Sequence, residues 1–251
     1  MANYSFDQYI KKAMKHDFLA NYYKYSDPSK HIHYYQKHLY YIQQAILTSS
    51  ENTNLRVNPP QIRILHASPD SPSVDIYINN KRVIRNLTYK QETDYIELQE
   101  PGRYTISIYP AGETGRPVLT ESFTFEGNQN YTVAAVDELN KLDLLFIYDN
   151  TDVPSGETKL RFVHLSPDAP AVDIAARGGD VIFSGVQFKE VTKYLPLSPM
   201  HVQLSVRIAG TKNVVLEIPA LNLRPNRTYT VYAVGFAKNR PVLEALISQD
   251  R

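Results

Sequence analysis

The chain has 251 residues, of which 43% are hydrophobic and 21% charged, a balance typical of folded globular proteins and not of disordered or membrane-spanning ones. Its 27 Lys and Arg nearly cancel its 26 Asp and Glu, so a formal charge of +1 gives no reason to expect nucleic acid or an anionic membrane as a partner. The absence of cysteine excludes disulfide bonds, thiolate metal sites and a cysteine nucleophile.

The start of the chain carries no recognisable targeting signal. Residues 1–7 lack the basic stretch and apolar run of a secretory signal, and no segment reaches the roughly 18 apolar residues of a spanning helix. We therefore expect no transmembrane segment and favour a cytoplasmic or spore-associated location over secretion by the signal-peptide route. A secreted chain already trimmed of its signal would look the same.

The first 54 residues predict a helical hairpin, because apolar residues recur every three or four positions along two stretches. The two stripes are Phe6, Ile10, Met14 and Phe18, and then Ile32, Tyr35, Leu39, Ile42 and Ile46. Between them, Asp27 is a typical N-cap and Pro28 a typical first helical residue. Together they predict where the second helix begins.

The predicted hairpin holds nine of the 19 tyrosines and four of the seven histidines. Tyrosine offers a large amphipathic contact area at low entropy cost, which suits docking onto another protein or self-association. The alternative is that these rings pack the hairpin onto a neighbouring domain. The candidate interaction residues are Tyr22, Tyr23, Tyr25, Tyr34, Tyr35, Tyr40 and Tyr41.

An internal repeat organises the rest of the chain. Residues 63–76 (RILHASPDSPSVDI) recur 98 positions later at 161–174 (RFVHLSPDAPAVDI), and the same offset relates 131–136 (YTVAAV) to 229–234 (YTVYAV). We infer a tandem duplication. The predicted hairpin, linker, first repeat, second linker and second repeat occupy residues 1–54, 55–60, 61–149, 150–158 and 159–251.

Each repeat shows the alternation of a half-buried strand. Apolar side chains at 74, 76 and 78 alternate with other residues, and further apolar runs cover 119–125, 131–136 and 142–148. Turn-forming pairs such as Pro101-Gly102 separate the runs. About seven or eight short strands per repeat without an intervening helix are typical of a two-sheet sandwich. The predicted fold class is mainly β, with two tandem antiparallel β-sandwiches of immunoglobulin-like size behind an α-helical hairpin.

The segment 66–75 (HASPDSPSVD), together with 102–105 (GRYT) and 130–133 (NYTV), resembles the bacterial family called domain of unknown function 4397. The resemblance covers both repeats, and the helical region resembles no family that we can name. It implies the fold and supplies no activity or catalytic residues. Many members of that family look secreted or surface-attached.

The repeated motif is where we look first for chemistry, because its histidine and aspartates could form a metal site or an acid–base pair. A structural role is the favoured interpretation, since proline presets the backbone while serine and aspartate bind local amides. The motif residues are His66, Ser68, Pro69, Asp70 and Asp75, and then His164, Ser166, Pro167, Asp168 and Asp173. Calcium at Asp70 and Asp75, or at Asp168 and Asp173, is the alternative, although two carboxylates are few for that ion.

No Gly-x-Ser-x-Gly elbow or phosphate-binding glycine loop occurs, so we expect no catalytic residue and no cofactor. The leading hypothesis is a structural or adaptor protein that assembles or anchors itself through residues 1–54, in a setting such as a bacterial spore or envelope layer. A carbohydrate- or peptide-binding module using sandwich loops or a sheet face is the alternative, with Tyr77 and Tyr109 as stacking candidates. A hydrolase would need a pocket that perturbs His66 or His164.

Overall fold

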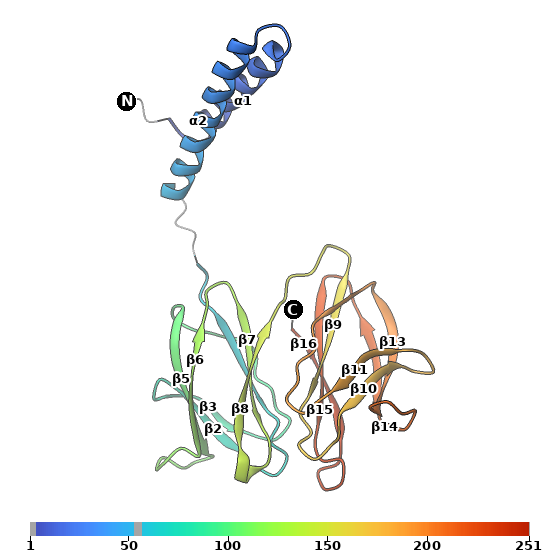
Figure 1. The fold of residues 1–251 in the computed structure, drawn as a ribbon. Coiled ribbons are helices and arrows are strands. Elements are labelled where there is room, and N and C mark those ends of the chain that lie inside the picture. The colour runs from blue at the N-terminus through green and yellow to red at the C-terminus, as the bar shows by residue number, and fades with distance from the viewer. Residues whose placement is uncertain (1–3, 53–56, 251) are drawn as a thin grey trace. The chain divides into compact units, whose positions relative to one another are not determined.

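The computed structural model describes residues 4–52 and 57–250. The chain divides into two compact units, Met1–Val57 with the helices and Asn58–Arg251 with the strands (Figure 1). The predicted fold class, two β-sandwiches behind two helices, is confirmed. Of the predicted linker at 55–60, residues 55–56 lie outside the described residues.

The first unit is an antiparallel hairpin of α1 (Phe6–Tyr23) and α2 (Pro28–Asn52). Ser5 caps α1 in a capping box, in which the Gln8 amide donates to the Ser5 hydroxyl at 3.4 Å and the Ser5 amide donates to Gln8 Oε1 at 2.9 Å. Asp27 caps α2 by accepting from the Lys30 amide at 3.1 Å, so the predicted start of this helix is confirmed. Within the described residues, no helix combines the length and apolar character needed to span a membrane.

The second unit begins with the first repeat, whose strands form two sheets of order β4-β1-β7-β8 and β3-β2-β5-β6. A short 3-10 helix, Leu139–Lys141, interrupts the connection between the last two strands. The strands are β1 (Gln61–His66), β2 (Val74–Ile78), β3 (Lys81–Leu87), β4 (Ile96–Glu97), β5 (Gly102–Pro110), β6 (Leu119–Phe125), β7 (Asn130–Val136) and β8 (Asp143–Asp149).

The second repeat builds the same two sheets, β12-β9-β15-β16 and β11-β10-β13-β14. Its strands are β9 (Thr158–His164), β10 (Val172–Ala176), β11 (Val181–Val186), β12 (Leu195–Leu197), β13 (Met200–Ile208), β14 (Val214–Leu223), β15 (Arg227–Val234) and β16 (Glu244–Gln249). The sequence predicted antiparallel sandwiches, and the structure adds one parallel pairing to each, β1 with β7 and β9 with β15. This pairing is possible because the preceding strand lies in the opposite sheet, so the chain crosses over before it returns.

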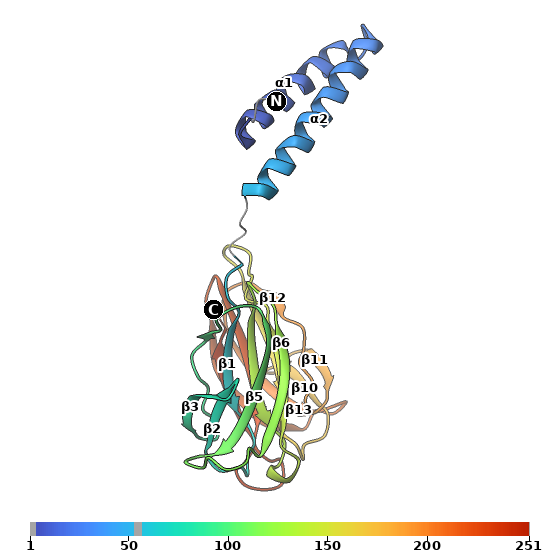
Figure 2. The same cartoon turned by 90° about the vertical axis from the view of Figure 1, so that its left-hand side faces the viewer.

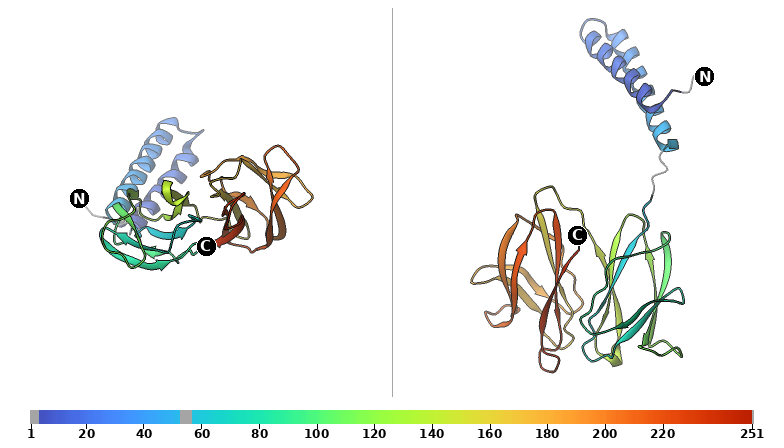
Figure 3. Two further views of the ribbon diagram at one scale, coloured as in Figure 1. Left: turned by 90° about the horizontal axis from the view of Figure 1, so that it is seen from below. Right: turned by 180° about the vertical axis from the view of Figure 1, so that it is seen from behind.

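The two sandwiches lie side by side, as Figure 1 and the view from behind in Figure 3 show, while Figure 2 looks onto the first repeat. Each has its own core: Ile62 and Ile64 of β1 belong to the first, and Leu160 and Phe162 of β9 to the second. A third apolar cluster combines residues of both repeats, with members from β1, β7, β8, β9 and β15. The sheets that carry β1 and β9 are therefore covered on both faces. This explains why nearly every residue of their central strands, β1, β7, β9 and β15, is buried.

Candidate functional site

The repeated motif forms a corner that ties one loop of the sandwich to another. His66 is fully buried, and its Nε2 lies 3.0 Å from the Pro72 carbonyl oxygen, to which it can donate. The Ser68 hydroxyl donates to the Asp137 carbonyl oxygen at 2.6 Å, and Asp70 Oδ1 accepts from the Leu139 amide at 2.8 Å. The loop after β1 is thus fixed to the connection between β7 and β8.

The second repeat reproduces this corner with small differences. His164 Nε2 lies 3.2 Å from the Pro170 carbonyl oxygen. Asp168 uses both carboxylate oxygens, accepting from the Ala237 amide at 2.6 Å and from the Lys238 amide at 3.0 Å. Burial lowers the pKa of both His66 and His164, so both imidazoles are neutral near pH 7.

The second aspartate of each motif lies on β2 or β10 and holds a bend in the neighbouring strand. Asp75 accepts from the Asn86 amide at 2.8 Å, and Asp173 accepts from the Gly185 amide at 2.7 Å. Both donors have left-handed backbones, with φ of 51° at Asn86 and 66° at Gly185. Although burial opposes its charge, the backbone amides that bond Asp75 lower the pKa of this carboxyl.

These bonds bear on the calcium candidates. Asp70, Asp75, Asp168 and Asp173 each accept from backbone amides, and the two carboxylates of a repeat serve different loops. Across residues 4–52 and 57–250, no three histidine, aspartate or glutamate side chains come close enough together to bind a metal ion. The geometry of the corner is that of a loop anchor.

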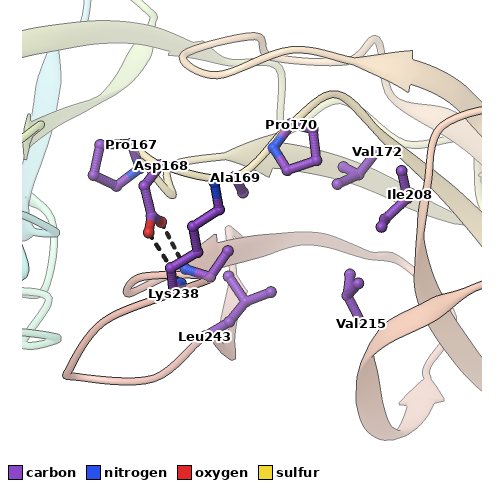
Figure 4. A pocket seen from close by; sticks show the side chains of 10 residues that line it. Pro167, Asp168, Ala169, Pro170, Val172, Ile208, Val215, Lys238 and Leu243 are labelled. Carbon is purple, nitrogen blue, oxygen red and sulfur yellow. Dashed lines mark hydrogen bonds between the residues drawn. The ribbon is translucent and has the colours of Figure 1, made fainter.

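A groove opens beside the motif corner of the second repeat (Figure 4). It has a volume of about 500 Å³ and lies between the motif loop, the β13–β14 hairpin and the loop before β16. Its walls are mostly apolar, and one of them carries Ala169 where the first repeat has Ser71. The lining residues are Pro167, Asp168, Ala169, Pro170, Val172, Ile208, Val215, Ala237, Lys238 and Leu243.

A buried polar network joins the two repeats. Arg63 of β1, only 2% exposed, pairs through Nη2 with Asp250 of the second repeat. The same guanidinium donates to the Thr132 hydroxyl at 2.7 Å, to Glu92 at 3.2 Å and to the Tyr232 hydroxyl at 3.1 Å. Burial opposes its charge, yet the Tyr232 hydroxyl and the surrounding carboxylates raise the pKa of Arg63. Arg63 is therefore permanently charged.

The equivalent arginine of the second repeat makes the reciprocal contact. Arg161 of β9 is 1% exposed, pairs with Asp149 at the end of β8, and donates to the Thr230 hydroxyl at 2.8 Å. Each repeat thus supplies an arginine to the other repeat's aspartate, as in a two-fold symmetric dimer. We call this arrangement the crossed ion pairs, Arg63 with Asp250 and Arg161 with Asp149.

The aspartates of the crossed ion pairs are fully bonded. Asp149 Oδ2 accepts from the Thr132 hydroxyl at 2.6 Å and from the Tyr95 hydroxyl at 2.7 Å. The corresponding donors to Asp250 are Thr230 at 2.7 Å and Tyr194 at 2.8 Å. Moving the repeats apart would leave these buried charges without partners. The network therefore holds the repeats in one relative position.

The helical hairpin packs through a seam of aromatic and small residues. His31 Nδ1 lies 2.9 Å from the Ala20 carbonyl oxygen, and His38 Nδ1 lies 3.0 Å from that of Ala13. Alanine allows this close approach because it has only a methyl group. The seam consists of Tyr9, Ala13, His16, Ala20 and Tyr23 on α1, and His31, Tyr34, His38, Tyr41 and Ala45 on α2.

The predicted apolar stripes lie outside this seam. Met14 is 66% exposed, Ile32 55% and Leu39 48%. We call the set Ile10, Met14, Ile32, Tyr35, Leu39 and Ile42 the apolar flank. Of the 22 large hydrophobic side chains that are exposed in the described part of the chain, 11 belong to residues 4–52, which are only 49 of 243 described residues. Apolar exposure is therefore concentrated on the hairpin.

The structure separates the seven candidate interaction tyrosines into two groups. Tyr23, Tyr34 and Tyr41 are half-buried in the seam, where Tyr23 and Tyr34 stack at 5.7 Å between ring centroids. The exposed group is Tyr22, Tyr25, Tyr35 and Tyr40. In the first sandwich, the stacking candidates Tyr77 and Tyr109 are half-buried against each other at 4.6 Å between centroids.

Sequence reasoning missed the crossed ion pairs, although a signal was present. Arg63 and Arg161 occupy the same position of the repeated motif, each between two apolar residues of a buried strand. A charge in the middle of such a strand in both copies indicates a buried partner. Nothing in the local pattern identifies that partner, because Asp250 lies 187 residues from Arg63.

The fold and these contacts define a tandem β-sandwich protein whose two repeats share a buried interface. The family model described as domain of unknown function 4397 matches residues 60–175, which cover the first repeat and the beginning of the second. The resemblance inferred from the repeated motif is confirmed by this match, and the helical region lies outside it.

No curated protein matches the chain. Among solved structures, it is similar to "a putative cell adhesion protein from Bacteroides ovatus ATCC 8483", with 13% identity and a TM-score of 0.21 over 76% of this chain and 95% of that one. A second, "a putative cell adhesion protein" from Bacteroides fragilis NCTC 9343, shows 9% identity and a TM-score of 0.19 over 76% and 97% of the two chains.

Proposed function

We propose that this chain is a non-catalytic structural or adaptor protein that assembles through its N-terminal hairpin and presents its two sandwiches as one rigid body. The setting we propose is a bacterial spore or envelope layer. The observation that carries this proposal is the apolar flank, since exposed apolar patches on otherwise folded proteins mark contact sites.

The motif residues support a non-catalytic role. The imidazoles of His66 and His164 are 0% and 1% exposed, so a substrate has no access to them. Their aspartate neighbours are engaged by backbone amides. We propose that the motif is a folding element common to both repeats.

Light scattering tests the assembly. We expect the full chain to form a species larger than its 28.7 kDa monomer, whereas a chain that begins at Asn58, where the second compact unit starts, stays monomeric. Equal monomeric masses for both chains would refute assembly through the hairpin.

A second candidate function is peptide binding in the groove of the second repeat. Its largely apolar walls, with Lys238 at the rim, fit an apolar peptide side chain better than a sugar. A displayed-peptide screen tests this candidate with a matched pair of variants. Val215 lines the groove and is 43% exposed, while its neighbour Val214 is 46% exposed and lies outside the lining. Val215→Asp should abolish binding and Val214→Asp should not.

A further inference from the structure

We infer that the partner of the hairpin is the hairpin of a second copy of this chain, and that the two pair through their apolar flanks into a four-helix bundle. The inference rests on the assembly proposed above and specifies its stoichiometry and surface.

The first argument is the position of the apolar flank on each helix. Every flank residue follows a seam residue by one position, as Met14 follows Ala13 and Leu39 follows His38. One residue corresponds to about 100° around an α-helix. On each helix, the step from a seam residue to the next residue turns the side-chain direction by this angle. Because α1 and α2 face each other and run antiparallel, this turn brings the flank residues of both helices to the same side of the hairpin. The flank therefore lies on one side of the hairpin and includes residues of both helices. On α1 it covers Ile10 and Met14, and the polar residues Asp17 and Asn21 follow on the same side.

The second argument is that this angle suits a bundle. In a four-helix bundle each helix contacts two neighbours in directions that differ by about 90°, close to the angle between seam and flank. In a single hairpin, each helix has a neighbour in only one of these two directions. A partner that contacts both helices from the other direction must be a layer two helices wide, and a second hairpin has this shape.

The third argument is the distribution of charge. Lys12, Lys15, Lys30 and Lys37 each precede a seam residue by one position, so they gather on the side opposite to the apolar flank. Lys12 Nζ lies there 3.7 Å from the Tyr4 ring centroid, and Lys30 Nζ 5.0 Å from that of Tyr23. Pairing through the apolar flanks leaves these lysines in solvent, whereas pairing through the basic side would bring like charges together.

The fourth argument is area. The side of the hairpin that carries the flank is about 27 Å long along the 18 residues of α1 and about 20 Å wide across two helices, a footprint of roughly 500 Å² per copy that includes Asp17 and Asn21 beside the apolar flank. Because side chains interdigitate, the accessible area removed exceeds this footprint. The accessible area removed per copy therefore lies at the lower end of the range for stable protein interfaces, which begins at about 600 Å² per partner.

The experiment measures the mass of the full chain by sedimentation over a range of micromolar concentrations. We expect a two-chain species of twice 28.7 kDa that dissociates on dilution. Leu39→Asp should raise the dissociation constant at least about 100-fold, because its carboxylate would be buried without a partner. Phe18→Asp is the matched control, since Phe18 is 70% exposed and lies two positions from seam residues His16 and Ala20, on the outer side of α1.

A second measurement keeps the test independent of any misfolding by Leu39→Asp. The chain has no cysteine, so Leu39→Cys and Phe18→Cys each introduce one thiol for maleimide labelling. We expect the thiol at 39 to be protected at high concentration and exposed on dilution, and the thiol at 18 to react freely throughout.

The outcomes separate this inference from the proposed function. A larger assembly lost on removal of residues 1–57 but unaffected by Leu39→Asp would overturn the pairing and leave assembly through the hairpin standing. Protection of the thiol at 39 in a monomer, independent of concentration, would show instead that the flank docks within its own chain. A full chain that is monomeric throughout, like the shortened one, would refute both.

Discussion

The seam of the hairpin and the interface between the repeats use polar side chains differently. Between the repeats, the residues of the crossed ion pairs are at most 3% exposed, and a separate apolar cluster combines residues of both sandwiches. In the hairpin, aromatic rings and histidine–carbonyl bonds join the helices, while the most hydrophobic residues face outward. The interface between the repeats buries the crossed ion pairs, whereas the hairpin leaves large apolar side chains exposed.

This difference indicates how each part acts. A buried charge pair adds little net stability over apolar packing, but it tolerates only one geometry, so it specifies the arrangement of the repeats. An exposed apolar face specifies little by itself and lowers its free energy on contact with another such face. The difference supports the proposal that the sandwiches form a rigid body and that the helices associate.

Arg161→Met tests whether the interface between the repeats depends on the crossed ion pairs. The substitution leaves the Asp149 carboxylate buried without its main cation, and we expect a loss of about 3–5 kcal/mol of unfolding free energy in urea titrations. Lys90→Met is the control, because the Lys90–Glu244 pair also joins the repeats but is 37% and 43% exposed, so its loss should be at most about 1 kcal/mol. Similar losses for both variants would mean that the interface is not sealed from water.

The sequence predicted local elements well. The apolar run at 119–125 coincides with β6, and Asp27 with Pro28 starts α2 as expected. These features depend on alternation and capping, which are visible within a few residues.

Features that depend on distant residues were not predictable. Arg63 and Asp250 lie 187 residues apart, and Arg161 and Asp149, although 12 residues apart, belong to different repeats, so no local pattern identifies either pair. In the hairpin, the apolar stripes predicted the two helices, but the contact between them is made by residues one position away, such as Ala13 and His38. Alanine, tyrosine and histidine fit a close helix pair by size and hydrogen bonding, which a hydrophobicity pattern does not measure.

A smaller effect, in the loop that borders the groove, tests how rigid the sandwich body is. Gly235 has φ of +90°, and a Cβ there would lie 2.4 Å from the Val242 carbonyl oxygen. Gly210 has φ of +72° with nothing within 4 Å of such a Cβ. We expect Gly210→Ala to lose about 1 kcal/mol from backbone strain and Gly235→Ala about 2–3 kcal/mol, since the clash adds to the strain. Equal losses in thermal unfolding would indicate a loop that moves aside.

The pH dependence of stability probes the buried motif histidines. Their pKa is lowered by burial in the folded state, whereas an unfolded histidine titrates near pH 6.5. Below that pH the unfolded chain binds more protons, so stability is complete above about pH 6.5 and declines as the pH falls toward the folded pKa values. The slope is at most about 1.4 kcal/mol per pH unit for each histidine. We expect His66→Gln and His164→Gln to flatten this slope, and an unchanged slope would show that neither histidine is responsible.

The last prediction concerns the melting temperature of the hairpin. It distinguishes the stability of the hairpin itself from the stability that it gains by association. Ser5→Ala removes the capping box of α1 and should cost about 1 kcal/mol, seen as a lower melting temperature of the helical circular-dichroism signal. Ser26→Ala, in the turn between the helices, should change it by no more than a few tenths of a kcal/mol. Because Ser5 lies outside the apolar flank, more than one helical turn before its first residue Ile10, Ser5→Ala should lower melting at every concentration without altering the dependence on concentration. If that dependence disappears with the cap, the flank and the helix end are not independent, and association also requires a fully formed α1.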